Sequence, residues 1–123
     1  MDTVVKSIES VAPYAGPHAI AGIRFRAVGK ALGVEAWGMN VLEVDAGCDL
    51  YPEHDHVKDG QQEVYVVLRG SATLRTPDGE QRLSVGDMAL VAPAVTRKLV
   101  PGADGVTLLA IGATPGQPYA SNL

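Results

Sequence analysis

Short strand-like runs separated by turns are the feature that most limits the fold of this sequence. From Val34 to Ile111 the chain contains about eight or nine such runs, with turns roughly every 8 to 12 residues. The clearest run is Glu63–Arg69 (EVYVVLR), which is rich in β-branched and aromatic residues. No stretch between the runs is long enough for the helical crossover that joins parallel strands. The pattern therefore predicts an all-β protein, an antiparallel sandwich or barrel.

Glycine and proline mark the ends of these runs. Thr76–Gly79 (TPDG) lies between two strand-like runs, and Asp-Gly in that position is a strong hairpin signal. Gly70 is expected to end the EVYVVLR strand. Leu50–His56 is expected to form another strand, and residues 27–32 a short helix that ends at Gly33.

The size and composition of the chain indicate one globular domain. The chain has 123 residues, of which 46% are hydrophobic and 20% charged, so it is too short for two cores and too apolar to be disordered. We expect residues 1–33 to form an N-terminal arm that packs on the barrel. Residues 34–113 would form the barrel, and residues 114–123 an irregular tail.

The net charge, the length of the apolar runs and the cysteine count argue against several classes of protein. The net charge of −4, without a lysine or arginine cluster, argues against a nucleic-acid partner. No apolar run reaches the roughly 18 residues that cross a membrane. Cys48 is the only cysteine, so the chain has no internal disulfide. Because the first 20 residues also lack a secretory pattern, we expect a cytoplasmic location.

One polar stretch, YPEHDHVKDGQQE, contains a candidate metal site. His54 and His56 are two residues apart, so they share one face of an extended segment. Glu63 begins the next run and shares a face with Tyr65 and Val67. Two imidazoles and a carboxylate suit iron, manganese, nickel, copper or zinc. The alternative is a solvated turn with two surface histidines, which fits the charged neighbours Asp55, Lys58 and Asp59.

These spacings resemble the two motifs of the cupin superfamily, in particular its small single-domain members of the conserved-barrel (cupin 2) type. The first motif, G-x5-H-x-H-x3-4-E-x6-G, matches His54, His56, Glu63 and Gly70. The second, G-x5-P-x-G-x2-H-x3-N, begins at Gly86-Asp87 and passes through Pro93. The resemblance covers residues 34–111. It implies a double-stranded β-helix, or jelly-roll barrel, with an internal pocket and a short irregular or partly helical N-terminal segment.

The sequence departs from these motifs at several positions. The first glycine has moved to Gly47, which leaves Cys48 at the motif position, and six residues separate His56 from Glu63. Ala94 replaces the second-motif glycine. The third histidine of the family falls on Arg97, which stays protonated and has no lone pair for a metal.

Three interpretations of Arg97 remain open. In the first, His54, His56 and Glu63 hold the metal alone, and Arg97 binds a substrate carboxylate beside Tyr65. In the second, Arg97 pairs with Glu63 inside the barrel, and the pocket binds an acidic ligand without metal. In the third, Arg97 points to solvent, because a one-residue register shift would exchange it with Lys98.

The family resemblance implies two alternative functions. One is a metal-dependent oxygenase or isomerase that uses iron, manganese, nickel or zinc and acts on a small anionic molecule; its catalytic residues are not assigned. The other is a metal-free, non-catalytic protein that binds a small acidic ligand through Arg97. The resemblance also implies a homodimer, because small cupins commonly pair. The apolar outer face of Val64, Val66 and Leu68 would be covered by the partner or by the second sheet of the same barrel.

Four further residues are weaker candidates. His18 lies in a Gly/Pro-rich segment that would bring it over the pocket as a ligand, although a surface histidine is the simpler interpretation. Cys48 is expected to be buried and inert rather than reactive. Trp37 and Met39 are candidates for the pocket wall, and core packing explains both equally well.

Overall fold

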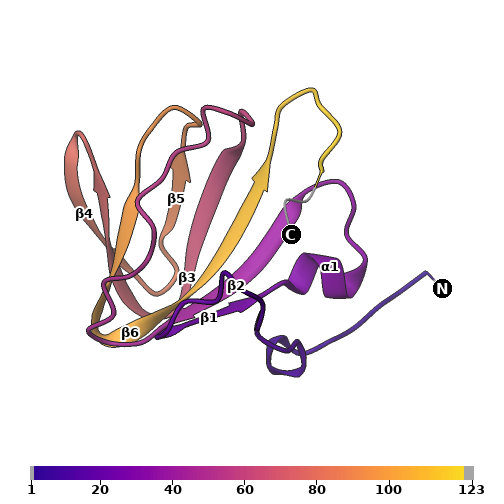
Figure 1. Ribbon diagram of the computed structural model, residues 1–123, viewed down its shortest axis with the longest axis horizontal. Coiled ribbons are helices and arrows are strands. Elements are labelled where there is room, and N and C mark those ends of the chain that lie inside the picture. Colours follow the sequence, from indigo (N-terminus) through magenta and orange to yellow (C-terminus); the bar gives the residue numbers. More distant parts are fainter. Residues whose placement is uncertain (1, 121–123) are drawn as a thin grey trace.

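The computed structural model describes residues 2–120 and contains one antiparallel sheet with very little helix (Figure 1). Two short helical segments lie near the N-terminus, η1 (Ile8–Ser10) and α1 (Val28–Leu32). The strands, in chain order, are β1 (Ile23–Arg26), β2 (Gly38–Val44), β3 (Gln62–Thr76), β4 (Gly79–Ser84), β5 (Met88–Val91) and β6 (Lys98–Ala113). Within the described residues, neither helical segment has the length and apolar character needed to cross a membrane.

The strand order is β1-β2-β6-β3-β4, with β5 beside the first half of β3. The first half of β3 pairs with the second half of β6, and the second half of β3 pairs with the first half of β6. The register of this ladder shifts between Val67 and Arg69 and again between Gly70 and Ala72. The sheet bends there and folds over on itself, which gives the expected jelly-roll barrel.

Gly70 lies at this bend. The expectation that it ends the strand is wrong, because β3 continues through it to Thr76. Its φ is 73°, and a Cβ at this position would overlap the carbonyl oxygen of Gly105 on β6. A bulge at glycine therefore lets the two backbones approach closely while the strand changes direction.

The alternation of side chains along β3 follows the prediction. Tyr65 and Val67 are each 1% exposed and belong to the main core, whereas Leu68 on the opposite face is 40% exposed. The predicted hairpin is also present, since Thr76 pairs with Gly79 across the turn between β3 and β4. The expected helix is present as α1, and Gly33 caps it with a left-handed φ of 87°.

The expected strand over Leu50–His56 is reduced to a single bridge between His54 and Arg97. Pro52 has no amide hydrogen to donate to a ladder, and the facing segment turns at Ala92–Val95, where the amide of Val95 donates to the carbonyl of Ala92. Among the described residues, three backbone hydrogen bonds, two between His54 and Arg97 and one from His56 to Pro93, therefore attach this segment in place of a regular ladder.

The N-terminal segment does more than pack on the barrel. Pro13 forms a bridge with Arg26, and the amide of Tyr14 donates to the carbonyl of Phe25 at 2.7 Å. β1, which lies within the expected arm, adds a strand to the sheet beside β2. The described part of the tail, residues 114–120, is irregular, and residues 121–123 lie outside the described range.

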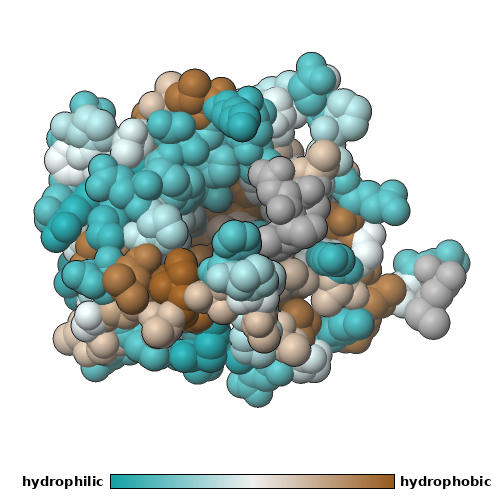
Figure 2. All heavy atoms as spheres, viewed as in Figure 1, coloured by the Kyte–Doolittle hydropathy of each residue, from teal (hydrophilic) through white to brown (hydrophobic). Residues whose placement is uncertain are grey.

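The face of the molecule seen in Figure 2 is mostly hydrophilic, with small separate apolar patches. The core lies between the two halves of the folded sheet. It includes Leu42, Tyr65, Leu99 and Leu108. The candidate site lies at one end of this interior.

Candidate metal centre

His54 and His56 are held by the residues that precede β6. The amide of His54 donates to the carbonyl of Arg97 at 3.0 Å, and the amide of Arg97 donates back to His54 at 2.8 Å. The amide of His56 donates to the carbonyl of Pro93 at 2.8 Å. These contacts keep both histidine side chains on the inner side of the connection, although it is not a regular strand.

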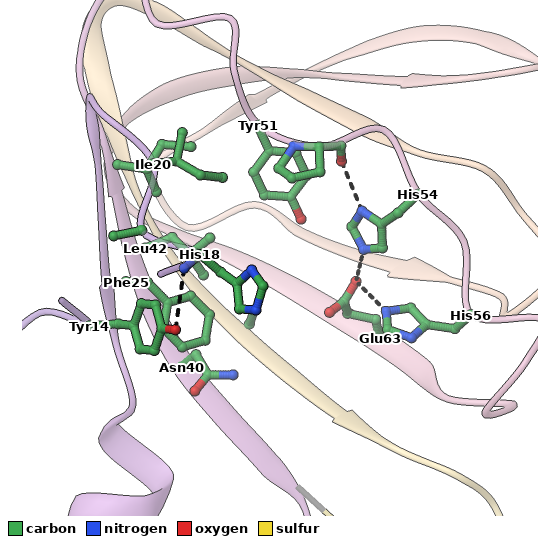
Figure 3. Close-up of a pocket in the computed structure, with 14 residues that line it drawn as sticks. Tyr14, His18, Ile20, Phe25, Asn40, Leu42, Tyr51, His54, His56 and Glu63 are labelled. Carbon is green, nitrogen blue, oxygen red and sulfur yellow. Dashed lines mark hydrogen bonds and ion pairs between the residues drawn. The ribbon is translucent and has the colours of Figure 1, made fainter. Parts of the chain in front are cut away.

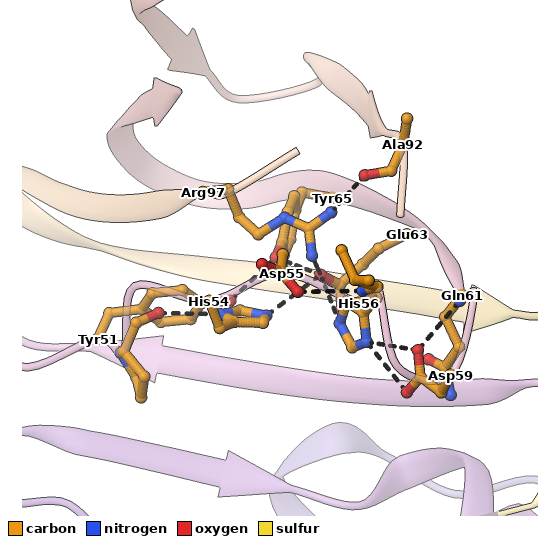
Figure 4. A network of polar contacts seen from close by, with 12 residues as sticks. Tyr51, His54, Asp55, His56, Asp59, Gln61, Glu63, Tyr65, Ala92 and Arg97 are labelled. Carbon is orange, nitrogen blue, oxygen red and sulfur yellow. Dashed lines mark hydrogen bonds and ion pairs between the residues drawn. The ribbon is translucent and has the colours of Figure 1, made fainter. Parts of the chain in front are cut away.

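The two imidazoles converge on the carboxylate of Glu63, the second residue of β3 (Figure 4). Nε2 of His54 lies 3.8 Å from Oε1 of Glu63, and Nε2 of His56 lies 3.6 Å from the same oxygen. One donor atom from each residue lies within 4.8 Å of the other two. This group could hold a metal ion, because nitrogen and oxygen ligands need to move only slightly to reach about 2.1 Å from a common centre.

The outer ring nitrogens fix how the two rings face. Nδ1 of His54 contacts the carbonyl of Pro52 at 2.9 Å, so Nδ1 carries the proton. Nδ1 of His56 contacts the two oxygens of Asp59 at 3.1 and 3.2 Å. Nε2 of His56 is buried and has no hydrogen-bond partner among the described residues. Both rings thus turn Nε2 toward the centre, the orientation in which a neutral imidazole would offer that nitrogen to a metal.

Arg97 lies behind the carboxylate and is 0% exposed, so the interpretation that it points to solvent is wrong. Its Nη2 donates to the carbonyl of Ala92 at 2.9 Å, and its Nη1 lies 3.7 Å from Oε1 of Glu63. Nε and Nη1 have no hydrogen-bond partner in the described chain. The neighbour Lys98 instead bonds the carbonyls of Asp49 and Tyr51, which settles the register question.

Two buried tyrosines hold the same carboxylate. The hydroxyl of Tyr65 donates to Oε1 of Glu63, and the hydroxyls of Tyr51 and Tyr65 are 3.0 Å apart. Because Tyr65 gives its proton to Glu63, Tyr51 donates to Tyr65. Burial raises the pKa of both tyrosines well above the ordinary value, so both remain protonated donors.

The electrostatic balance favours an ionised carboxylate. Burial alone raises the pKa of Glu63, but the contacts with His54 and Tyr65 and the charge on the histidines outweigh it, and the pKa lies below its ordinary value. The contact with Glu63 raises the pKa of His54 despite the opposing effect of burial. Glu63 is therefore negative at neutral pH and available to a cation.

A cavity of about 280 Å³ opens in front of this triad of His54, His56 and Glu63 (Figure 3). Its remaining walls come from the N-terminal segment, β1, β2, the 51–52 connection and β6. They consist of Tyr14, His18, Ala19, Ile20, Ile23, Phe25, Asn40, Leu42, Tyr51, Pro52 and Ala110. His18 is thus part of the wall, but it does not belong to the group of converging donor atoms.

Several wall residues were not anticipated from the sequence. Phe25 and Leu42 lie on recognised strand-like runs, but nothing in those runs showed which face would be internal. Of the other candidates, Trp37 and Met39 lie away from this cavity, and Tyr65 and Arg97 lie behind the triad rather than in the wall. Cys48 is half-buried and packs against the core, 3.6 Å from the carbonyl of Ala21.

Comparison with solved structures shows that the chain has the cupin fold. It is similar to a sugar phosphate isomerase of the cupin superfamily from Silicibacter pomeroyi, with a TM-score of 0.73, 22% identity, and coverage of 95% of this chain and 81% of that one. It is also similar to a predicted oxalate decarboxylase from Thermotoga maritima, with a TM-score of 0.72, 15% identity, and coverage of 90% and 99%. A cupin protein from Bacteroides fragilis matches with a TM-score of 0.65, 18% identity, and coverage of 89% and 91%.

No protein-family model matches the sequence, and no curated protein is significantly similar to it. At these levels of identity the comparisons establish the architecture, and the chemistry has to be argued from the site itself.

Proposed function

We propose that this chain binds a divalent transition metal through His54, His56 and Glu63 and acts on a small molecule in the adjoining cavity. The observation that carries the proposal is the orientation of the two imidazoles. Each ring bonds an oxygen acceptor through its outer nitrogen and turns Nε2 toward the same carboxylate oxygen of Glu63. A solvated pair of histidines has no physical reason to leave a buried Nε2 without a partner.

The donor set also fits this group of metals. Two histidines and one carboxylate leave several coordination positions open, a pattern typical of non-haem iron and compatible with manganese, nickel and zinc. When bound, such an ion supplies Lewis-acid or redox chemistry to an oxygen-bearing substrate. A metal-dependent oxygenase or isomerase is the corresponding class of enzyme.

The chain's own residues would orient the reaction. Tyr65 keeps the Glu63 carboxylate in a fixed position, and Tyr51 fixes Tyr65 in turn. The mainly apolar cavity wall adjoins the open side of the triad, where a substrate would lie. Tyr14, His18 and Asn40 face the same space and offer polar groups that could contact a bound molecule beyond the triad (Figure 3).

A second function is supported by one specific contact. Nη1 of Arg97 lies 3.7 Å from Oε1 of Glu63, so the carboxylate already has a buried cation beside it. A fixed positive charge at this distance repels a metal ion and weakens its binding. The alternative is therefore a non-catalytic protein that binds a small molecule without metal.

Elemental analysis separates the two functions. The protein would be purified without a histidine tag or chelator, beside a His54→Ala, His56→Ala double variant. About one ion per chain in the wild type, lost in the double variant, is the expected result. If neither sample retains metal after incubation with iron, manganese, nickel and zinc salts, the metal proposal fails and the binding protein is favoured.

A further inference from the structure

The cavity has two chemically different ends. At one end are the two imidazoles and the carboxylate of the triad. On the side away from the triad the wall includes Ile20, Phe25 and Leu42, with the polar side chains of Tyr14, His18 and Asn40 among them (Figure 3). Ile23 and Ala110 add further apolar surface to the lining. A molecule that fills the space therefore meets the polar triad on one side and a mainly apolar wall on the other.

Among residues 2–120, no lysine or arginine lines this cavity. Arg24 and Arg26 flank Phe25 on β1 but point to the other face of the sheet. There Nε of Arg26 and Nε of Arg24 contact Oε1 of Glu43 at 2.9 and 3.2 Å. Arg97 is enclosed behind Glu63 and does not reach the wall. Arg24, Arg26 and Arg97 are therefore directed to Glu43 or Glu63 rather than into the cavity.

The absence of lysine and arginine from the described wall disfavours a phosphate group away from the triad. Proteins bind a phosphate group with arginine or lysine side chains or with the amides at the start of a helix. The wall contains neither, because its residues belong to strands and connections. A phosphate in the apolar part of the cavity would lose its hydration without compensation. If the phosphate instead took the head-group position at the triad, the sugar hydroxyls would lie against the apolar wall, which is also unfavourable.

The volume limits the ligand as well. A space of about 280 Å³ accommodates on the order of ten non-hydrogen atoms, at about 30 Å³ for each water-sized group. Polar contacts along its sides are few, and they come from the amide of Asn40, the ring of His18 and the hydroxyl of Tyr14. That hydroxyl also accepts a long hydrogen bond from the amide of His18 at 3.4 Å.

We propose that the ligand has an apolar, ring-sized body and a single oxygen-bearing head group, as in a small aromatic carboxylate, and that phosphorylated sugars are excluded. The body lies against Phe25 and Leu42, and the head group lies at the triad. The inference rests on the proposed function only for the head group, which a metal ion would hold. The choice of an apolar body follows from the cavity wall alone.

The test uses three named probes. Benzoate and ribose 5-phosphate are titrated into the zinc-loaded protein by calorimetry, and benzyl alcohol is titrated into metal-free protein by ligand-observed NMR. We expect benzoate to bind at least tenfold more tightly than ribose 5-phosphate, and benzyl alcohol to bind without metal. Zinc content is measured separately on the same samples.

A pair of isoleucine variants locates the binding. Ile20→Asn places an amide in the apolar wall and is expected to weaken benzoate and benzyl alcohol by about tenfold, with zinc affinity unchanged. Ile8→Asn makes the same change on η1, outside this cavity, and should leave the affinity for both probes as in the wild type. NMR shifts on adding benzyl alcohol should include Phe25 and Ala110, which tests the location without a variant.

The outcomes separate this inference from the proposed function. Ribose 5-phosphate binding as tightly as benzoate would overturn the inference, as would failure of both aromatic probes in protein that carries one zinc per chain. Loss of zinc binding with retained benzyl alcohol binding would overturn the proposed metal function and leave the apolar class of ligand standing.

Discussion

At the scale of single residues, Arg97 distinguishes this site from the motif that its sequence resembles. The guanidinium takes the place where a third imidazole is expected, and it lies against the carboxylate that would bind the metal. A buried arginine with two unbonded nitrogens is costly unless its charge is used. We infer that Arg97 lowers metal affinity, because its fixed positive charge lies 3.7 Å from the carboxylate oxygen that would bind the ion.

Replacing this cation should strengthen metal binding. We expect Arg97→His to raise zinc affinity by about 10- to 100-fold, because the change removes a repulsive charge and adds a ligand beside His54. A competition titration against a chelator measures the change. Lys98→His is the control, since Lys98 bonds the carbonyls of Asp49 and Tyr51 rather than the triad. Equal zinc affinities in wild type and Arg97→His would contradict this role.

The triad could be anticipated from the sequence, whereas the position of Arg97 could not. His54 and His56 share a face in any extended segment, and the seven residues from Glu63 to Gly70 matched a known spacing. Whether Arg97 or Lys98 points inward depends on one residue of register. That register is set by the bridge to His54, a tertiary contact that no local pattern encodes.

At the scale of strands, the close approach of β3 and β6 at Gly70 determines the bend of the sheet. Gly70→Ala is expected to destabilise the protein by about 2 kcal/mol or more, because it adds the strain of a positive φ and an overlap with the carbonyl of Gly105. Urea unfolding measures the loss of stability.

Gly47→Ala is the matched control for this change. Gly47 has a similar φ of 78°, but a Cβ there meets no atom within 4 Å. Gly47→Ala should therefore lose only the stability that corresponds to the strain of a positive φ, roughly 1 kcal/mol. Equal losses in the two variants would show that the contact between Gly70 and Gly105 is unimportant for stability.

The pairing of β1 with β2 should depend on pH through Glu43. Arg24 lies opposite Glu43 in the ladder, and Nε of Arg26 is 2.9 Å from its carboxylate. Burial tends to raise the pKa of Glu43, but the bonds from Arg26 and Arg24 bring it below the ordinary value. Because the folded-state pKa is lowered, this stabilisation is complete above about pH 4.3, the ordinary pKa of glutamate. It is lost as the pH falls through the folded-state pKa.

Glu43→Gln should therefore lose about 1 kcal/mol of stability at pH 7, and the difference from wild type should shrink at acid pH. Urea unfolding at several pH values checks both statements. Glu35→Gln, an exposed change before β2, should have no such pH-dependent effect. If the stability difference between wild type and Glu43→Gln instead grew at acid pH, the pKa of Glu43 would be raised in the folded protein rather than lowered.

Sequence patterns predicted most strands because turns and β-branched runs are local signals. The hairpin at Thr76–Gly79 and the helix before Gly33 are examples. The failures have tertiary causes. β3 passes through Gly70 because a bulge accommodates the glycine, and the 50–56 segment forms only one bridge because Pro52 interrupts any ladder. The contribution of residues 14–20 to the cavity depends on packing over β1, which no periodicity reveals.

At the scale of the whole molecule, the outer face of the sheet carries two apolar rows across four strands. Paired residues share a face, so one row runs through Leu90, Val64, Ile111 and Met39, and the other through Met88, Val66, Leu109 and Val41. At the β2 end Val41 is fully buried, and α1 and η1 lie over this part of the face. At the β5 end Met88 and Leu90 are 74% and 65% exposed.

The N-terminal residues of the chain also carry exposed apolar side chains. Residues 2–7 run away from the sheet ahead of η1 (Figure 1), and Val4 and Val5 among them are 44% and 87% exposed. In a twofold dimer, residues 2–7 of each copy would cover the exposed β5 end of the two apolar rows on the other copy. A standard interface of about 800 Å² per partner is roughly a tenth of the surface of this chain, 7495 Å².

We therefore expect a homodimer through the β5 end of this face. Light scattering after gel filtration at micromolar concentration should give twice the mass of one chain. The double variant Met88→Lys, Leu90→Lys should be monomeric, and removal of residues 2–7 should weaken the dimer. Val57→Lys, at a residue that is 65% exposed outside the rows, should remain dimeric. A monomeric wild type would contradict the prediction.

The cavity wall formed by Tyr14, His18 and Ile20 has a consequence for how such a protein can change. The groups that would bind metal belong to the connection before β3 and to β3 itself, whereas this wall belongs to a segment outside the β3–β6 ladder. Ligand choice and metal chemistry are thus encoded in separate stretches of sequence. Evolution, or an engineer who shuffles residues 13–20, has a route to new ligand preferences in which the reactive centre need not be rebuilt.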